Sequence, residues 1–272
     1  MGQIGHFLAR GWQVFAICPD GPRIESIQAR GVRWLPLNLT RRLFDPLGDF
    51  RAAARIVQYC RQHQFHIVHT HNIKAGLIGR VAARLAGAPR VVHTVHGMAF
   101  DKTTPTPQRQ LHVALERAAC LCADRILVQS QDDADTLLHL DVVDSDKLVY
   151  IGNGVALERF SPGAANRETV RRELAIGDDH VLFLSAGRLV REKGFLELAQ
   201  ATGLARARDA RIRVAIAGPR DGDKRDAFTD EDLEVIRRAG VDVLGDRSDM
   251  PSLYAASDVV VLPSWREGLP RV

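Results

Sequence analysis

The 272-residue sequence predicts an α/β fold with mostly parallel sheets. Short β-branched runs alternate with longer segments of helical periodicity. The runs are hydrophobic almost throughout, which is typical of strands covered on both faces. The alternation starts afresh near residue 180. Hydrophobic residues make up 46% of the chain and charged residues 26%, so the composition can fill a sizeable core.

The expected strands are the runs WQVFAI, FHIVHT, RVVHTV, DRILVQ, KLVYIG, HVLFLSA, RIRVAIAG and DVVVLPS. Two segments between them space apolar side chains at i, i+3, i+4 and i+7, as amphipathic helices do. In segment 74–88 the apolar stripe is Ile78, Val81, Ala82 and Leu85, with the arginines on the other side. In segment 107–123 it is Leu111, Leu115, Ala118 and Cys122.

The stretch NGVALERFSPGAANRE separates two such series and is rich in turn residues. We therefore expect two Rossmann-like domains, 1–160 and 161–272, facing each other across a ligand cleft at the carboxyl ends of their strands. Both domains are expected to be incomplete. The chain opens on a helix, GHFLARG, instead of a strand and a glycine-rich turn, and it stops soon after a strand, at PSWREGLPRV.

Charge and cysteine usage narrow the function classes. The net charge of +4 suits an anionic ligand or a membrane surface, although many proteins carry such a charge for solubility alone. Basic and aromatic residues are not interleaved in this sequence, so nothing in it indicates nucleic-acid binding. The four cysteines lack metal-site spacing and predict a reduced, cytoplasmic protein. No apolar run approaches the ~20 residues of a membrane span, and the amino terminus lacks the apolar core of a signal peptide.

The segment LSAGRLVREKGF, residues 184–195, joins the end of a strand to the start of a helix and carries three cations. These are Arg188, Arg191 and Lys193. Cations beside a helix amino terminus hold phosphate groups well, because the helix dipole and free N–H groups also favour negative charge there. The segment is not a P-loop, since Glu192 and Gly194 flank the lysine. A solvated charged turn is the alternative interpretation.

A second segment, LPSWREGLPRV, follows the last predicted strand. A carboxylate at the carboxyl end of a strand can accept hydrogen bonds from sugar hydroxyls, which makes Glu267 a candidate sugar ligand. Gly268 would let a ligand approach the backbone closely. The alternative roles for Glu267 are a helix cap or a salt bridge.

Four histidines lie at the ends of two predicted strands: His69, His71, His93 and His96. His69 and His71 are two residues apart and share a face of the strand. The group can be a zinc site, a catalytic base or a structural cluster. Metal is the least favoured, because no cysteine or carboxylate pattern with metal spacing accompanies the histidines. His96 lies where an imidazole can contact substrate or move a proton, whereas His69 and His93 are expected to be structural.

Taken in order, four segments resemble the retaining, GT-B-fold glycosyltransferases of family 4. The segments are VHTHNIKAGLIGRVAARLAGAPRVVHTVHGMAF, GNGVALERFSP, AGRLVREKGF and DMPSLYAASDVVVLPSWREGLP. The first is similar to the branch that adds sugars to polyprenyl-diphosphate-linked glycans in bacterial capsule, O-antigen or protein-glycosylation pathways. The likeness runs from about residue 11 to the end of the chain.

The resemblance implies transfer of a sugar, with retention, from a nucleotide-sugar (UDP-linked) to a glycan or polyprenyl-diphosphate-linked acceptor. It implies no metal and no other cofactor. Arg188 and Lys193 match the pair that binds the donor diphosphate. Glu267 matches the first of two spaced glutamates and would contact the donor sugar, with the backbone N–H groups of Gly268 and Leu269 beside it.

His96 matches the histidine that touches the reacting sugar, and His71 lies toward the acceptor by proximity. The resemblance thus implies a catalytic set of His96, Arg188, Lys193 and Glu267. Arg247 and Ser248, in the turn GDRSDMP, resemble the segment that contacts the nucleobase. A cytoplasmic protein with a peripheral contact on the inner face of the plasma membrane is also implied.

Parts of the family pattern are missing from this sequence. The glycine-rich loop after the first strand should precede Met1, the ribose-binding second glutamate would fall beyond Val272, and the final helices are absent. Three alternatives therefore stay open: a GT-B-like UDP-sugar epimerase, a non-catalytic binding fragment and, more distantly, a metal hydrolase.

Overall fold

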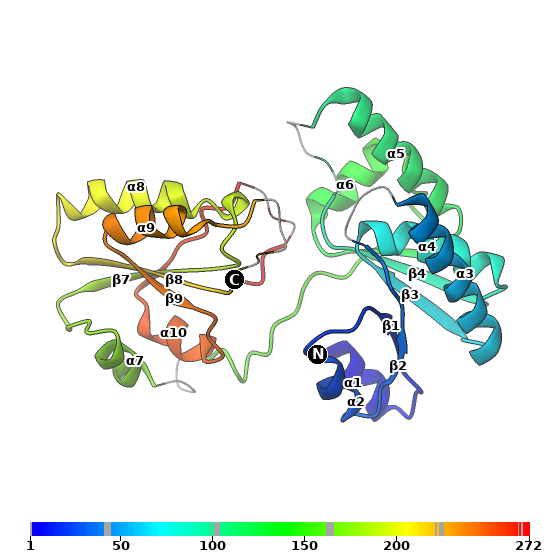
Figure 1. Ribbon diagram of the computed structural model, residues 1–272, viewed down its shortest axis with the longest axis horizontal. Helices are drawn as coiled ribbons and strands as arrows, with labels where there is room; N and C mark the ends of the chain where they lie inside the picture. The colour runs from blue at the N-terminus through cyan, green and yellow to red at the C-terminus, as the bar shows by residue number, and fades with distance from the viewer. Residues whose placement is uncertain are drawn as a thin grey trace. The chain divides into compact units, whose positions relative to one another are not determined.

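The computed structural model describes residues 2–40, 45–98, 100, 104–161, 166–220, 222, 226–265, 267 and 269–272. It divides into two compact units, Met1–Gly152 and Asn153–Val272 (Figure 1). The division lies at the start of the turn-rich stretch identified in the sequence, eight residues before the predicted domain boundary. Within the described ranges, no helix combines the length and the apolar character that crossing a bilayer requires.

The N-terminal unit holds a four-stranded parallel sheet in the order β3-β4-β5-β6 and a separate parallel pair, β1-β2. Its strands are β1 (Phe15–Cys18), β2 (Arg33–Pro36), β3 (Ile67–His71), β4 (Arg90–Val95), β5 (Arg125–Val128) and β6 (Leu148–Tyr150). Its helices are α1 (Gly2–Ala9), α2 (Ile24–Gln28), α3 (Pro46–His63), α4 (Ile73–Leu85), α5 (Thr106–Cys120) and α6 (Gln131–His139).

The C-terminal unit holds a second parallel sheet in the order β10-β7-β8-β9. Its strands are β7 (Val181–Ala186), β8 (Ile212–Ala217), β9 (Val241–Gly245) and β10 (Val259–Val260). Its helices are α7 (Arg167–Glu173), α8 (Phe195–Arg206), α9 (Asp230–Arg238), α10 (Met250–Ala256) and the 3₁₀ helix η2 (Arg191–Lys193). The predicted α/β class with parallel sheets is therefore confirmed in both units.

Strand β8 shows why a central strand is hydrophobic throughout. Val214 and Ile216 pack into one core with α8 and α9, while Ala215 and Ala217 pack into another with α7 and α10. Figure 1 shows these two helix pairs on opposite faces of the sheet. Alternate side chains point to opposite faces, so both registers of the strand must be apolar.

Strand β10 is also hydrophobic in sequence, but the expectation that it is covered on both faces is wrong. Its two residues, Val259 and Val260, remain 39% and 45% exposed. The strand pairs with β7 and no other described strand, so one of its edges is not covered by a neighbour.

The predicted apolar stripe of α5 faces the wrong way, and that of α4 is half right: Ile78 and Ala82 face the core, whereas Val81 and Leu85 are exposed. Leu85 on α4 is 69% exposed and Leu111 on α5 is 55% exposed, whereas Arg80 is completely buried. Small residues of α4, including Ala82 and Ala83, take the place nearest the sheet. Burial of small side chains lets the helix approach closely, and the larger apolar side chains are left on the outside.

Two features make the burial of Arg80 and the close approach of α4 feasible. The Arg80 guanidinium lies 2.8 Å from Glu116 Oε1 on α5 and donates to the Gly76 carbonyl at 2.9 Å. A buried charge requires such a partner. Gly76 is needed for another reason: a Cβ at this position would lie 2.4 Å from Cε1 of His93 on β4.

Candidate active site

In the C-terminal unit, two loops meet beyond the neighbouring strands β7 and β10. The loop after β7 contains η2, and the loop after β10 runs through Trp265 to Glu267. The backbone N–H of Trp265 donates to the Glu192 backbone carbonyl at 3.0 Å. The Lys193 ammonium lies 2.5 Å from Glu267 Oε1. Two residues singled out by the sequence, 74 positions apart, are therefore in direct contact.

Gly194 sets how closely these loops pack. It has φ of +69°, ends η2 and caps α8, and an added Cβ would lie 2.1 Å from the Pro263 carbonyl oxygen. Only glycine adopts this backbone geometry without strain and without that collision. The tight turn places Lys193 directly before the amino terminus of α8, where the N–H groups and the helix dipole favour anions.

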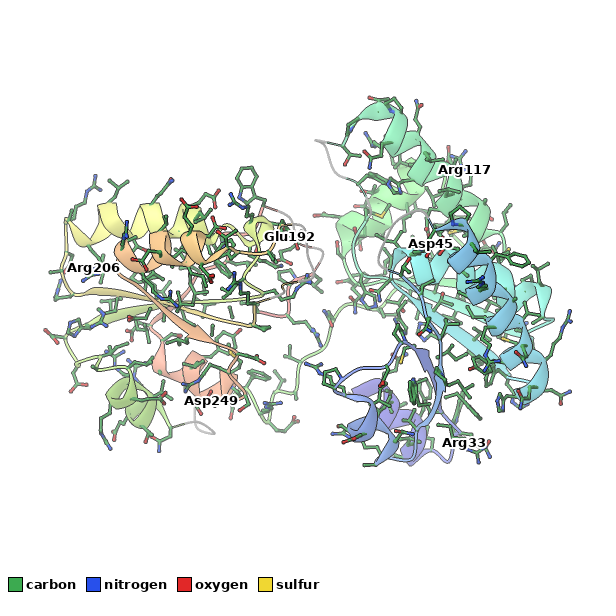
Figure 2. All side chains as sticks on the ribbon, viewed as in Figure 1. Arg33, Asp45, Arg117, Glu192, Arg206 and Asp249 are labelled. Atoms are coloured by element: carbon green, nitrogen blue, oxygen red, sulfur yellow. The ribbon has the colours of Figure 1, made fainter. Side chains whose placement is uncertain are left out.

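The three cations of this loop have different surroundings. Arg191 donates to both carboxylate oxygens of Asp232, at 2.8 and 3.1 Å, and so binds the loop to the start of α9. Arg188 is 44% exposed, with Nη2 3.7 Å from Glu192 Oε1. Figure 2 labels Glu192, the partner of Arg188, on the C-terminal unit. Arg188 and Lys193 therefore remain the candidates for a phosphate, and Arg191 has a structural role.

The residues around Glu267 are only partly described. The Glu267 side chain is 24% exposed and its carboxylate is occupied by Lys193. The Leu269 carbonyl accepts a hydrogen bond from Asn153 Nδ2 at 3.3 Å. Gly268 lies outside the described residues.

Arg247 and Ser248 follow β9, two strands away from β7 in the same sheet. The Arg247 guanidinium donates to Asp249 at 2.8 Å and to Glu173 at 2.5 Å (Figure 2 labels Asp249). Its hydrogen bonds to Asp249 and then to Glu173 raise the pKa of Arg247. The Ser248 carbonyl accepts from Arg159. Both residues lie at the carboxyl edge of the sheet, and the Arg247 side chain already has two acidic partners.

In the N-terminal unit, the four histidines occupy two environments. The rings of His69 and His71 share a face of β3 with centroids 4.3 Å apart. His71 Nδ1 lies 3.0 Å from His96 Nε2, where His96 follows β4. His93 is 3% exposed and its Nδ1 contacts Thr70 Oγ1 at 2.9 Å.

These surroundings keep several of the rings uncharged at neutral pH. Burial, reinforced by the neighbouring His71 and His96, lowers the pKa of His69 to about 4. Burial, and then the charge of Arg80, lowers the pKa of His93 to about 3. The pKa of His71 is lowered by burial and then by His96. Desolvation disfavours an imidazolium, so His69, His71 and His93 behave as neutral donors and acceptors.

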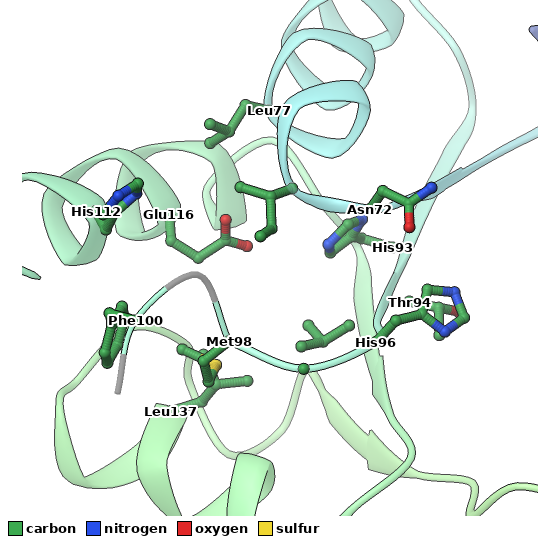
Figure 3. A pocket seen from close by; sticks show the side chains of 13 residues that line it. Asn72, Leu77, His93, Thr94, His96, Met98, Phe100, His112, Glu116 and Leu137 are labelled. Carbon is green, nitrogen blue, oxygen red and sulfur yellow. The ribbon is translucent and has the colours of Figure 1, made fainter. Parts of the chain in front are cut away.

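A cavity of about 130 Å³ opens beside these strand ends (Figure 3). Leu77, Met98 and Phe100 contribute apolar walls, and Glu116 and His96 contribute polar groups. The carboxylate of Glu116 points toward the space in Figure 3. The volume is small, and the lining combines apolar surface with few polar atoms.

Sequence reasoning missed one residue of this cluster. Gln129 follows β5 directly, and its Oε1 lies 2.9 Å from His96 Nδ1. The signal was available: Gln129 is the last residue of the predicted strand DRILVQ, and His96 comes directly after the predicted strand RVVHTV. Among the described residues, no group of three or more His, Cys, Asp or Glu side chains is arranged to hold a metal ion.

Comparison with known proteins gives consistent matches over both units. Residues 2–154 match the glycosyl transferase 4-like domain, and residues 166–272 match the glycosyl transferases group 1 family. A UDP-Gal:alpha-D-GlcNAc-diphosphoundecaprenol alpha-1,3-galactosyltransferase of Escherichia coli is 32% identical over 93% of this chain. The capsular polysaccharide biosynthesis glycosyltransferase CapM of Staphylococcus aureus is 22% identical over the whole chain.

The chain spans 66% of the E. coli relative and 70% of CapM. Among solved structures, the HepE protein of Anabaena in complex with UDP and glucose matches with a TM-score of 0.72 and 19% identity. That match covers 98% of this chain and 70% of HepE. At this identity the likeness establishes the fold, and the ligands in its title are those of HepE.

Proposed function

The chain belongs to the family-4 type glycosyltransferases, and on that premise we propose that it serves to transfer a sugar from a UDP-sugar to a polyprenyl-diphosphate-linked or glycan acceptor. The proposed pathway is cell-surface polysaccharide or glycan biosynthesis. The E. coli relative, named for a UDP-galactose donor and a diphosphoundecaprenol-linked acceptor, supports this choice of substrates.

The contact between Lys193 and Glu267 carries the proposal. It joins a cation just before α8 to a carboxylate in the loop after β10, at 2.5 Å. A donor diphosphate would take the ammonium of Lys193, together with the guanidinium of Arg188. The Glu267 carboxylate would then be available for the hydroxyls of the donor sugar, with Gly268 and Leu269 beside it.

Further roles complete the proposed site. His96 would contact the reacting sugar and His71 would lie toward the acceptor. Arg247 and Ser248, at the carboxyl edge of the same sheet as Lys193, would contact the nucleobase. We propose no metal in this reaction, because cationic side chains supply the countercharge for the diphosphate.

The proposed reaction proceeds with retention at the anomeric carbon. The bond from the anomeric carbon to the donor phosphate oxygen breaks while the acceptor oxygen bonds to that carbon on the same face. The acceptor proton passes to the departing phosphate. Negative charge grows on the diphosphate, and Arg188 and Lys193 would stabilise it; preorganised charge of this kind contributes several kcal/mol in enzymes.

The proposed cellular location is the cytoplasm, with a peripheral contact on the inner face of the plasma membrane. The formal charge of +4 and the exposed apolar side chains of α4 and α5 support such a contact. Nucleic acid is not proposed as a partner.

The test is calorimetric titration of UDP and a panel of UDP-sugars into this chain in EDTA, beside the Arg188→Ala variant. We expect saturable binding that survives the chelator and is lost in the variant. Absence of binding by a protein with a cooperative unfolding transition would contradict the proposal and favour a non-catalytic fragment. Release of free UDP from the donor without any acceptor would instead favour a UDP-sugar epimerase.

A further inference from the structure

Three neighbouring parallel strands of the N-terminal unit end in side chains that are hydrogen-bonded in a row. His71 ends β3, His96 follows β4 and Gln129 follows β5. The registers pair His71 with Thr94 and Val95 with Val128, so the three strand ends are level. The row runs from His71 Nδ1 to His96 Nε2 at 3.0 Å, and from His96 Nδ1 to Gln129 Oε1 at 2.9 Å.

The position of Gln129 is fixed by the elements on either side of it. Val128 before it is completely buried in the core. Ser130 after it caps α6, and its hydroxyl accepts from the Asp133 N–H at 3.2 Å. A side chain held between a buried strand and a capped helix has little backbone freedom, so Gln129 presents a nearly fixed acceptor to His96.

The row specifies which nitrogen of His96 carries a proton. The amide oxygen of Gln129 can only accept, so His96 Nδ1 must donate. In a neutral imidazole the other nitrogen then has a lone pair, so His96 Nε2 accepts. His71 Nδ1 must therefore donate to it.

We propose that Gln129 is a positioning residue that holds His96 in the Nδ1–H tautomer, so that Nε2 accepts a hydrogen bond from a substrate hydroxyl. The proposal rests on the proposed function, in which His96 contacts a sugar. When no substrate is bound, His71 Nδ1–H donates to the lone pair of His96 Nε2. The substrate hydroxyl would replace His71 as the donor to this atom. An unprotonated Nε2 favours a hydroxyl over a phosphate oxygen, which has no proton to donate at that contact.

The tautomer is tested directly by long-range ¹H–¹⁵N NMR of protein labelled in its histidines, with the His96 signals assigned by a His96→Asn variant. We expect a protonated Nδ1 and an unprotonated Nε2 in the unsubstituted protein. Gln129→Met keeps the side-chain length without an acceptor and should shift His96 toward the Nε2–H tautomer. Gln129→Glu keeps an acceptor oxygen and should retain the protonated Nδ1.

Gln131→Met is the matched control, because Gln131 contacts Asp135 on the exposed side of α6. It should leave the His96 signals unchanged. An Nε2–H tautomer in the unsubstituted protein, or an unchanged His96 in Gln129→Met, would overturn the proposal.

A kinetic measurement separates this proposal from the proposed function. If the transferase assignment holds, Gln129→Met should lower sugar transfer roughly tenfold, since a misoriented group loses much of its contribution. Gln129→Glu should recover most of that loss, and UDP affinity should be the same in all three proteins. Absence of transfer in every protein, together with the expected NMR pattern, would count against the function alone. Equal transfer by Gln129→Met and the unsubstituted protein would count against the role of Gln129.

Discussion

The two units place opposite chemistry at the ends of equivalent strands. In the N-terminal unit, three adjacent strands end in imidazole and amide groups that hydrogen-bond to one another, with the pKa values of His69 and His71 lowered by burial. In the C-terminal unit, two adjacent strands lead into loops joined by the Lys193–Glu267 ion pair. Both sheets are parallel, so the difference comes from side chains and not from topology.

The difference indicates what each sheet edge can bind. Neutral donors and acceptors suit hydroxyl groups, because neither partner must lose a strongly hydrated charge. Ammonium and guanidinium groups beside a helix amino terminus suit a diphosphate. The predictions below test whether the charged edge governs the donor nucleotide and the neutral edge governs the sugar.

The largest effect is expected at the charged edge. Lys193→Ala or Arg188→Ala should lower turnover of the UDP-sugar about a hundredfold or more, since each removes charge that stabilises the departing diphosphate. Steady-state kinetics with a saturating acceptor measures this. Arg191→Ala is the control from the same loop, because Arg191 is paired with Asp232; its turnover should stay near normal. Near-normal turnover in the Lys193 and Arg188 variants would contradict their assignment.

Glu267→Gln sharpens the comparison because it should affect the contact to the donor sugar without weakening the binding of UDP. We expect turnover to fall roughly thirtyfold, because the amide is a poorer acceptor for sugar hydroxyls. UDP itself should bind equally well or a few-fold more tightly, because the substitution removes a competing partner of Lys193. Calorimetry with UDP, set beside kinetics with the UDP-sugar, checks both parts. A parallel loss of UDP affinity would mean that Glu267 only positions Lys193.

The sequence predicted contacts that depend on local spacing and missed those that depend on packing. His69 and His71, two apart on a strand, share a face as expected, and their rings lie 4.3 Å apart. The period of α4 was also right, but only Ile78 and Ala82 of its predicted apolar stripe face the core. A hydropathy pattern cannot show that Glu116 on another helix would neutralise Arg80 inside the protein.

For the candidate site too, the sequence predicted the local features and missed the contacts that depend on packing. The types of residue in the loop after β7 indicated an anion site, but contact between Lys193 and Glu267 requires knowing that β10 lies beside β7. Arg191 looked equivalent to Arg188 in sequence, and only its pairing with Asp232 separates the two. Gln129 escaped notice because a single glutamine after a strand has no motif around it.

Smaller effects are expected at the neutral edge. His96→Ala should lower turnover about tenfold, which is the size expected for a contact to a neutral hydroxyl. UDP affinity should not change. The closely spaced His93 offers the contrast: it is buried against Thr70, so His93→Ala should destabilise the N-terminal unit by about 2 kcal/mol. Urea unfolding and kinetics on both variants would distinguish a substrate contact from a structural one. A stability loss in His96→Ala as large as in His93→Ala would remove the distinction.

The smallest effect concerns pH and affects the two units differently. Below about pH 6.5 the unfolded chain takes up protons on its histidines. Folded His93, with its pKa of about 3, does not. The unfolded state then binds more protons, so the free energy of unfolding falls as the pH falls. Between pH 7 and 5.5, His93 alone should cost the N-terminal unit about 1 kcal/mol.

Urea unfolding of a Trp265→Phe variant measures this loss, because the remaining tryptophans, Trp12 and Trp34, both lie in the N-terminal unit. His93→Asn keeps a polar group near Thr70 without a titrating ring, so its stability should depend less steeply on pH. The hydrogen bonds from Arg247 lower the pKa of Asp249, so that carboxylate begins to take up protons only in more acid solution. Identical pH slopes in His93→Asn and its parent would mean that His93 titrates normally in the folded protein, which would contradict the lowering of its pKa by burial.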